Sequence, residues 1–213
     1  MPWLVGAVAL FAAGVLVWRL SSSRVQVPCP AWLSWLVELD NPVFRNNRAA
    51  AIVAGLQLEP GMSVLDAGCG PGRLTLPMAR AVAPSGSVVA FDLQGEMLAK
   101  VEARARAASL SNISYRQGAL GSGAVGAGPF DRAVLATVLG EIPDQAAALG
   151  EIFAALKPGG MLAVTEVIAD PHFQRRSRVL RLAEAAGFRE TLRTGGALSY
   201  TLYLQKPPLA QAP

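Results

Sequence analysis

The segment that most constrains the fold spans residues 64–72 and reads VLDAGCGPG. Its first residues have the apolar character of a buried strand, and Gly68, Gly70 and Gly72 then precede a helical pattern. Open α/β sheets bind ligands where such a strand passes into a helix, and glycine lets the backbone turn tightly and approach the ligand. The segment therefore predicts a ligand site at the carboxyl end of a central strand.

Strand-like and helix-like segments alternate from residue 46 onward. The expected strands are residues 63–67, 87–92, 113–117, 131–137, 161–167, 188–194 and 199–205. The expected helices are residues 45–56, 68–82 (with the glycine loop at its start), 95–108, 144–156 and 173–186. This alternation predicts an α/β fold in which helices cover both faces of a mostly parallel sheet.

The glycine loop departs from the dinucleotide-binding pattern G-x-G-x-x-G. Arg73 stands where the third glycine belongs, and Asp66 at the strand end would repel a pyrophosphate. A carboxylate at Asp66 suits an ammonium group, while the helix N-terminus can receive a carboxylate. An amino acid joined to a nucleoside combines these groups, so an NAD-dependent oxidoreductase is disfavoured.

The second strand ends in another acid, Asp92, which can accept hydrogen bonds from two ribose hydroxyls. Leu93 and Met97 follow and can enclose an adenine with apolar surface. The alternative for Asp92 is a helix N-cap. In this order and spacing, the loop and these residues point to one nucleoside ligand.

These motifs resemble the class I S-adenosylmethionine-dependent methyltransferases, nearest to the branch acting on small molecules, lipids and quinones. The resemblance covers about residues 46–206 and is carried by VLDAGCGPG (64–72), VVAFD (88–92), FDRAVLATVLGEIPD (130–144) and LKPGGMLAVTE (156–166). It implies a Rossmann-like sheet of seven strands, ordered 3-2-1-4-5-7-6, with the last strand antiparallel. It also implies S-adenosylmethionine as the cofactor.

The resemblance assigns roles residue by residue. Those implied for the methionine part of the cofactor are Asp66, Gly68, Cys69, Gly70 and Gly72; those for the nucleoside are Asp92, Leu93, Met97, Gly118, Ala119 and Leu120. Thr137 completes the expected cofactor-binding set at the methyl group, and Thr137, Val138 and Glu141 would face the methyl group and the acceptor. Many relatives carry an acid at the place of Ala119, where it bonds the adenine amino group; here backbone groups or water would serve, or adenine is held less selectively.

Three side chains are candidates for a catalytic base: Glu141 after the fourth strand, Glu166 at the end of the fifth, and His172, the single histidine. Each has a structural alternative. Glu141 could begin a helix, Glu166 could make a structural hydrogen bond or contact the cofactor, and His172 could cap a loop. Proximity and orientation can supply roughly 7–11 kcal/mol of a methyl transfer, so a base is optional. The sequence does not decide among the three.

The N-terminal residues 1–25 are expected to form a membrane-anchoring or transmembrane helix. Residues 3–18 carry no charge and span roughly 24 Å as a helix, with Trp3 and Trp18 at the ends. Arg19 and Arg24 then predict a single-pass protein with its catalytic domain on the cytoplasmic side. A signal peptide and an in-plane or buried helix are the alternatives.

The remaining domain boundaries follow from breaks in composition. Residues 26–45 are expected to be a linker and an amphipathic lid helix, residues 46–206 the methyltransferase domain, and residues 207–213 a flexible tail. Cys29 and Cys69 form neither a disulfide framework nor a metal site. Nucleic-acid binding would require Lys/Arg clusters with exposed aromatic residues. The net charge of +4 includes one dense cluster spaced like one helix face, Arg175, Arg176, Arg178 and Arg181, for which attraction to an anionic membrane surface is the better functional interpretation.

The leading function is therefore methyl transfer to a small, lipophilic acceptor at the membrane surface: a lipid, quinone, thiol or phenol. One alternative is a protein methyltransferase. Another is a membrane-tethered interaction module that binds S-adenosylmethionine without catalysis. The expected partners are a small-molecule or lipid substrate and a membrane, without nucleic acid.

Overall fold

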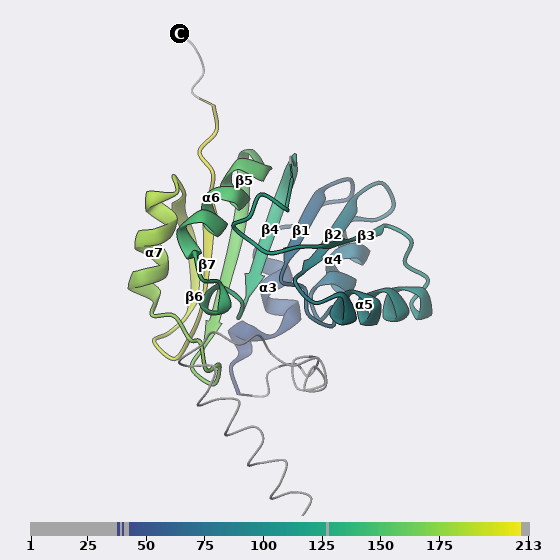
Figure 1. Ribbon diagram of the computed structural model, residues 1–213, viewed down its shortest axis with the longest axis horizontal. Coiled ribbons are helices and arrows are strands. Elements are labelled where there is room, and N and C mark those ends of the chain that lie inside the picture. The colour runs from purple at the N-terminus through teal and green to yellow at the C-terminus, as the bar shows by residue number, and fades with distance from the viewer. Residues whose placement is uncertain (1–37, 39, 41–42, 127, 210–213) are drawn as a thin grey trace, which may run out of the picture.

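One seven-stranded sheet organises the chain, in the order β3-β2-β1-β4-β5-β7-β6 (Figure 1). The computed structural model describes residues 38, 40, 43–126 and 128–209. The strands are β1 (Ser63–Ala67), β2 (Ser87–Asp92), β3 (Ile113–Gln117), β4 (Phe130–Ala136), β5 (Leu156–Val167), β6 (Arg189–Gly195) and β7 (Ser199–Gln205). β7 runs antiparallel to both β5 and β6, while β1 to β5 pair in parallel, which confirms the predicted order.

Helices pack against both faces of the sheet (Figure 1). They are α3 (Ala49–Gly55), α4 (Thr75–Val82), α5 (Gly95–Ala107), α6 (Gln145–Ala155) and α7 (Arg176–Ala185), with short 3₁₀ turns η2 (Arg45–Asn47) and η3 (Leu139–Glu141). α6 begins where its sequence predicts, because the Asp144 carboxylate accepts the Ala147 backbone N–H at 2.9 Å and so caps the helix.

Alternating side chains of the strands divide the core into two layers. Val64, Val88 and Val134 are buried on the side of α3 and α4, with Tyr203 of β7 among them. Leu65, Leu135 and Val164 point the other way and pack with residues of α6 and α7. Both faces of the central strands are therefore buried, as a parallel sheet requires.

Two expected elements differ in extent. The helix expected over residues 45–56 is divided at Arg48, whose extended backbone (φ −68°, ψ 143°) separates η2 from α3. β5 begins at Leu156, which pairs with Phe130, and so includes the residues 157–160 expected to form a turn. Residues 157–160, all within the described part of the chain, themselves have no partner in β4, because the register shifts between the Leu156 and Met161 pairs; the Gly159 N–H donates instead to the Lys206 carbonyl at 2.9 Å.

The predicted single-pass membrane location is wrong on the part of the chain that the structure describes. No helix among those residues is long and apolar enough to cross a membrane. The segment on which that prediction was based, residues 1–25, lies outside the described residues. Most of the expected lid helix, within residues 26–45, lies outside them as well.

Candidate active site

A cavity of about 210 Å³ opens where β1, β2, β4 and β5 end. These four strands are neighbours and parallel, so their carboxyl ends meet at one edge of the sheet. The sequence-predicted cofactor residues in its lining are Asp66, Gly68, Cys69, Gly70, Asp92, Leu93, Met97, Gly118, Ala119, Leu120 and Thr137. Eleven of the twelve predicted positions thus come together around one space.

Gly72 is the exception and lies outside the lining. A Cβ at this position would lie 3.0 Å from Leu76 Cδ1 and 3.2 Å from Val101 Cγ1. The missing side chain lets the loop pack against α4 and α5. Gly72 therefore affects the site only indirectly, by allowing the loop to pack closely against α4 and α5. Its position in the motif reflects this packing.

The glycine loop is held by the neighbouring strand and leaves no room for a side chain at Gly68. Gly68 has a φ of +77°, and its N–H donates to the Phe91 carbonyl at 2.8 Å. A Cβ on Gly68 would lie 2.6 Å from Val138 Cγ1, in the loop after β4. Glycine is needed here both for the backbone conformation and for this contact.

Asp66 is an acid buried at the base of the cavity, with 2% of its surface exposed. Its Oδ2 accepts the Thr75 hydroxyl at 2.5 Å. Burial raises the pKa of Asp66 to about 7 and the Asp92 charge adds to this, while the Thr75 bond and Arg73 oppose it. The carboxylate is poorly solvated, so a cationic ligand group would favour its charged form.

Asp92 fixes the glycine loop and the start of α5 at once. Its Oδ2 accepts the Gly70 N–H at 2.8 Å and its Oδ1 accepts the Gln94 N–H at 2.9 Å. Burial raises the pKa of Asp92, and these backbone bonds act against that shift. Gln94, not Asp92, occupies the N-cap position of α5, so the carboxylate remains at the cavity wall.

The apolar part of this wall comes from β2, α5 and the segment after β3. Met97 is almost fully buried and Leu93 is 52% exposed. The Gly118 N–H donates to the Asp92 carbonyl at 3.0 Å, which brings residues 118–120 beside the end of β2. Cys69 contributes to the lining, and burial raises the pKa of its thiol, so it is a poor nucleophile.

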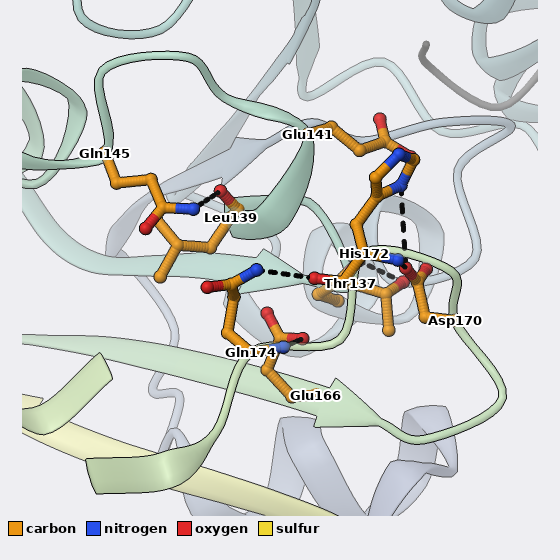
Figure 2. Close-up of polar contacts among 9 residues, drawn as sticks. Thr137, Leu139, Glu141, Gln145, Glu166, Asp170, His172 and Gln174 are labelled. Carbon is orange, nitrogen blue, oxygen red and sulfur yellow. Dashed lines mark hydrogen bonds and ion pairs between the residues drawn. The ribbon is translucent and has the colours of Figure 1, made fainter. Parts of the chain in front are cut away.

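The other end of the cavity holds a group of polar side chains from the segments after β4 and β5 (Figure 2). Glu141 and Asp170 line the cavity. His172 Nδ1 lies 3.7 Å from Glu141 Oε1 and 3.7 Å from Asp170 Oδ1. The structure thus brings two of the three candidate bases together, although only Glu141 is in the lining.

Glu166 lies behind this group and outside the lining. Its Oε2 accepts the Gln174 N–H at 3.0 Å, and its buried Oε1 has no hydrogen-bond partner among the described residues. Burial raises the pKa of Glu166 to about 8, with the Asp170 and Glu141 charges adding to the effect. These contacts match the structural alternative considered for this residue.

Two charged residues of the lining were not predicted as site residues. Arg73 has 11% of its side chain exposed, donates to the Asn47 carbonyl at 2.7 Å and lies 3.5 Å from Asp40 Oδ1. Asp170 reaches the cavity from the segment after β5. Its position two residues before the single histidine was the only available signal, since the sequence does not show which loops meet.

Comparison with known proteins gives a consistent assignment. Residues 58–191 match the family model described as "Methyltransferase domain". An arsenite methyltransferase of Aquipseudomonas alcaligenes is 36% identical over 149 residues, 66% of this chain and 43% of that protein. A demethylmenaquinone methyltransferase of Lactococcus lactis is 35% identical over 106 residues, 50% of this chain and 42% of that protein. The chain thus spans less than half the length of these relatives.

Solved structures support the fold. A SAM-dependent methyltransferase from Aquifex aeolicus superimposes with a TM-score of 0.73 at 19% identity, over 84% of this chain and 99% of that one. S-adenosylmethionine is the cofactor of the family to which these sequence and fold matches point. The chain belongs to the class I S-adenosylmethionine-dependent methyltransferases, a family of enzymes.

Proposed function

We propose that residues 46–206 transfer the methyl group of S-adenosylmethionine to a small acceptor with an apolar body. The observation that carries this proposal is the meeting of Asp66, Asp92 and the glycine loop in one cavity. Two buried acids and a glycine loop, whose backbone can approach a ligand closely, suit a ligand with an ammonium group and a ribose. This arrangement favours an amino-acid nucleoside over a dinucleotide.

The lining offers a partner for each part of the cofactor. Asp66 would bind the ammonium group, and Asp92 would accept hydrogen bonds from the ribose hydroxyls. Leu93 and Met97 would enclose the adenine, with residues 118–120 at its edge. When bound, S-adenosylmethionine supplies a methyl group on a positively charged sulfur. Thr137, directly after β4, would then lie between the cofactor and the acceptor.

The acceptor's expected character follows from the lining beyond Thr137. Val138, Ile142 and Pro143 present apolar surface to the cavity, so a flat or compact apolar body fits there better than an extended charged one. Relatives named for arsenite, demethylmenaquinone and nocamycin methylation favour a small molecule. A relative named for adenine-58 of tRNA makes RNA an outcome to test.

Two experiments test the proposal on the full chain. Calorimetry should show binding of S-adenosylhomocysteine and none of NAD; NAD binding alone would contradict the cofactor site. The protein is then incubated with methyl-labelled S-adenosylmethionine and a cell extract separated into small-molecule and lipid, protein, and RNA fractions. Label is expected in the small-molecule and lipid fraction. Label only in protein or RNA would reject a small acceptor.

A further inference from the structure

The cavity has two polar ends, and only one is explained by the cofactor. In the sheet order, β2 and β5 are separated by β1 and β4, so the two ends lie about three strand spacings, roughly 14 Å, apart. Asp92 marks the β2 end and Asp170 follows the β5 end. The proposed cofactor contacts leave Glu141 and Asp170 for the acceptor.

Glu141 and Asp170 are linked through one imidazole. The His172 ring is buried, and its Nδ1 lies 3.7 Å from a carboxylate oxygen of each acid (Figure 2). Asp170 Oδ1 also accepts the His172 backbone N–H at 2.6 Å. Both carboxylates therefore have a defined position relative to the ring, while both line the cavity.

Packing between the two loops sets this geometry. A Cβ on Gly140 would lie 2.7 Å from the His172 Cβ, so only glycine lets η3 approach the histidine this closely. Gln174 Nε2 donates to the His172 carbonyl at 2.7 Å, and Tyr200 Oη donates to the Gln174 carbonyl at 2.7 Å. The histidine segment is thus tied to β7, and Glu141 is placed against it.

Two carboxylates, each 3.7 Å from the same His172 nitrogen and both lining one cavity, favour ligand groups of particular charge. They repel an anionic group and accept hydrogen bonds from a neutral O–H. A thiolate or a free amine attacks a methyl sulfonium with little help, whereas a hydroxyl requires a base near it. Glu141, whose carboxylate lies 3.7 Å from the His172 imidazole and lines the cavity beside apolar residues, can serve as such a base.

Resting on the proposed methyl transfer, we propose that the acceptor is an aromatic or enolic alcohol, that Glu141 is its catalytic base, and that His172 is a positioning residue. Glu141 takes the proton from the acceptor O–H while the oxygen forms a bond to the methyl carbon. The carbon–sulfur bond breaks, and its electron pair stays on the sulfur of neutral S-adenosylhomocysteine. The proton then leaves Glu141 for solvent at the cavity mouth. Asp170 accepts the same hydroxyl or a second one on the ring.

A matched series of probes tests the acceptor class: 2-naphthol, 2-naphthoate and 2-naphthalenethiol share one ring system and differ in the reacting group. With S-adenosylhomocysteine bound, 2-naphthol is expected to bind at least tenfold more tightly than 2-naphthoate. Because the chain has a single histidine, the imidazole NMR signals of the tag-free protein identify His172 directly. They are expected to shift with 2-naphthol and not with 2-naphthoate.

Activity variants test the roles. Glu141→Gln is expected to lower kcat for 2-naphthol about 100-fold, and the control Glu184→Gln, on the exposed side of α7, to leave it unchanged. Gly140→Ala and His172→Gln are expected to lower kcat about tenfold. In all of these variants the KM for S-adenosylmethionine should stay within about twofold of the wild-type value. A lowered kcat with an unchanged KM is not what general misfolding would produce.

The outcomes separate this inference from the proposed function. Equal binding of 2-naphthoate and 2-naphthol, near wild-type turnover of Glu141→Gln, or methylation of the thiol but no hydroxyl would overturn the hydroxyl assignment. So would a protein that binds S-adenosylhomocysteine but methylates no hydroxyl in the series. Failure to bind S-adenosylhomocysteine would instead reject the methyltransferase proposal itself.

Discussion

The two ends of the cavity are built in different ways. At the cofactor end, Asp66 and Asp92 accept hydrogen bonds of 2.5–2.9 Å from Thr75 and Gln94 of their own strand–loop–helix units, and Asp92 also accepts one from Gly70 in the adjacent unit. At the acceptor end, Glu141 comes from the loop after β4 and both Asp170 and His172 come from the loop after β5, with His172 Nδ1 lying 3.7 Å from each acid. The first end is fixed by local hydrogen bonds, and the second by how two loops pack. Variants at the first should change cofactor affinity, and variants at the second should change turnover.

The largest expected effect is a loss of cofactor affinity when the cofactor end of the cavity is altered. Asp92→Ala removes the ribose acceptor and the bond to the Gly70 N–H, so S-adenosylhomocysteine affinity should fall about 100-fold, or about 2.7 kcal/mol. Calorimetry measures it, with Glu96→Gln on the exposed first turn of α5 as a control. A loss below about fivefold would remove the ribose assignment.

Asp66 should give the next largest effect, and one that depends on pH. Because burial raises the pKa of Asp66 to about 7, the carboxylate that attracts the ammonium group is lost as the pH falls through 7. Wild-type affinity for S-adenosylhomocysteine should therefore weaken from pH 8 to pH 6. Asp66→Asn should bind about tenfold more weakly at pH 8 with little dependence on pH. A parallel pH dependence in both proteins would contradict this role.

Glu166, behind the acceptor end, should differ from the acids of the cofactor end, because its protonation should affect the stability of the fold. Burial raises its pKa from 4.5 to about 8, so the carboxyl group stabilises the fold at low pH and that contribution is lost as the pH rises through 8. Between pH 6 and pH 8, wild type should lose about 2 kcal/mol of unfolding free energy relative to Glu166→Gln. Urea unfolding measures this difference, and Glu184→Gln should follow wild type. Identical slopes for Glu166→Gln and wild type would show that the buried carboxyl does not change its protonation on unfolding.

The smallest expected effect is a gain in affinity for S-adenosylhomocysteine. Ala119 lines the cavity at a position where the family resemblance implies an acid, so Ala119→Asp should add a hydrogen-bond acceptor for the adenine amino group. We expect S-adenosylhomocysteine affinity to rise about threefold, within the range of one exposed hydrogen bond. Sinefungin and an analogue lacking the adenine amino group provide the comparison, since only the former should gain. Equal gains would place adenine elsewhere.

The sequence predicted the cofactor end because its chemistry lies in short, continuous motifs. VLDAGCGPG contains most of β1, its acid Asp66 and the glycine loop that follows, and VVAFD contains most of β2 with its terminal acid Asp92, so spacing along the chain reflects spacing in the fold. The acceptor end was less accessible. Asp170 and His172 meet Glu141 only through the packing of β4 beside β5 and the close approach at Gly140. The role of Gly72 in helix packing was hidden for the same reason.

The contact between Gly68 and Val138 joins the loop that follows β1 to the loop that follows β4. A ligand that moves one of these loops must move the other, because no space separates them. Occupancy of the two halves should therefore be thermodynamically linked, with each ligand changing the affinity of the other by the same factor. A factor above one would make each reactant bind better to the half-occupied chain than to the empty one, and a factor below one would make each reactant hinder the entry of the other.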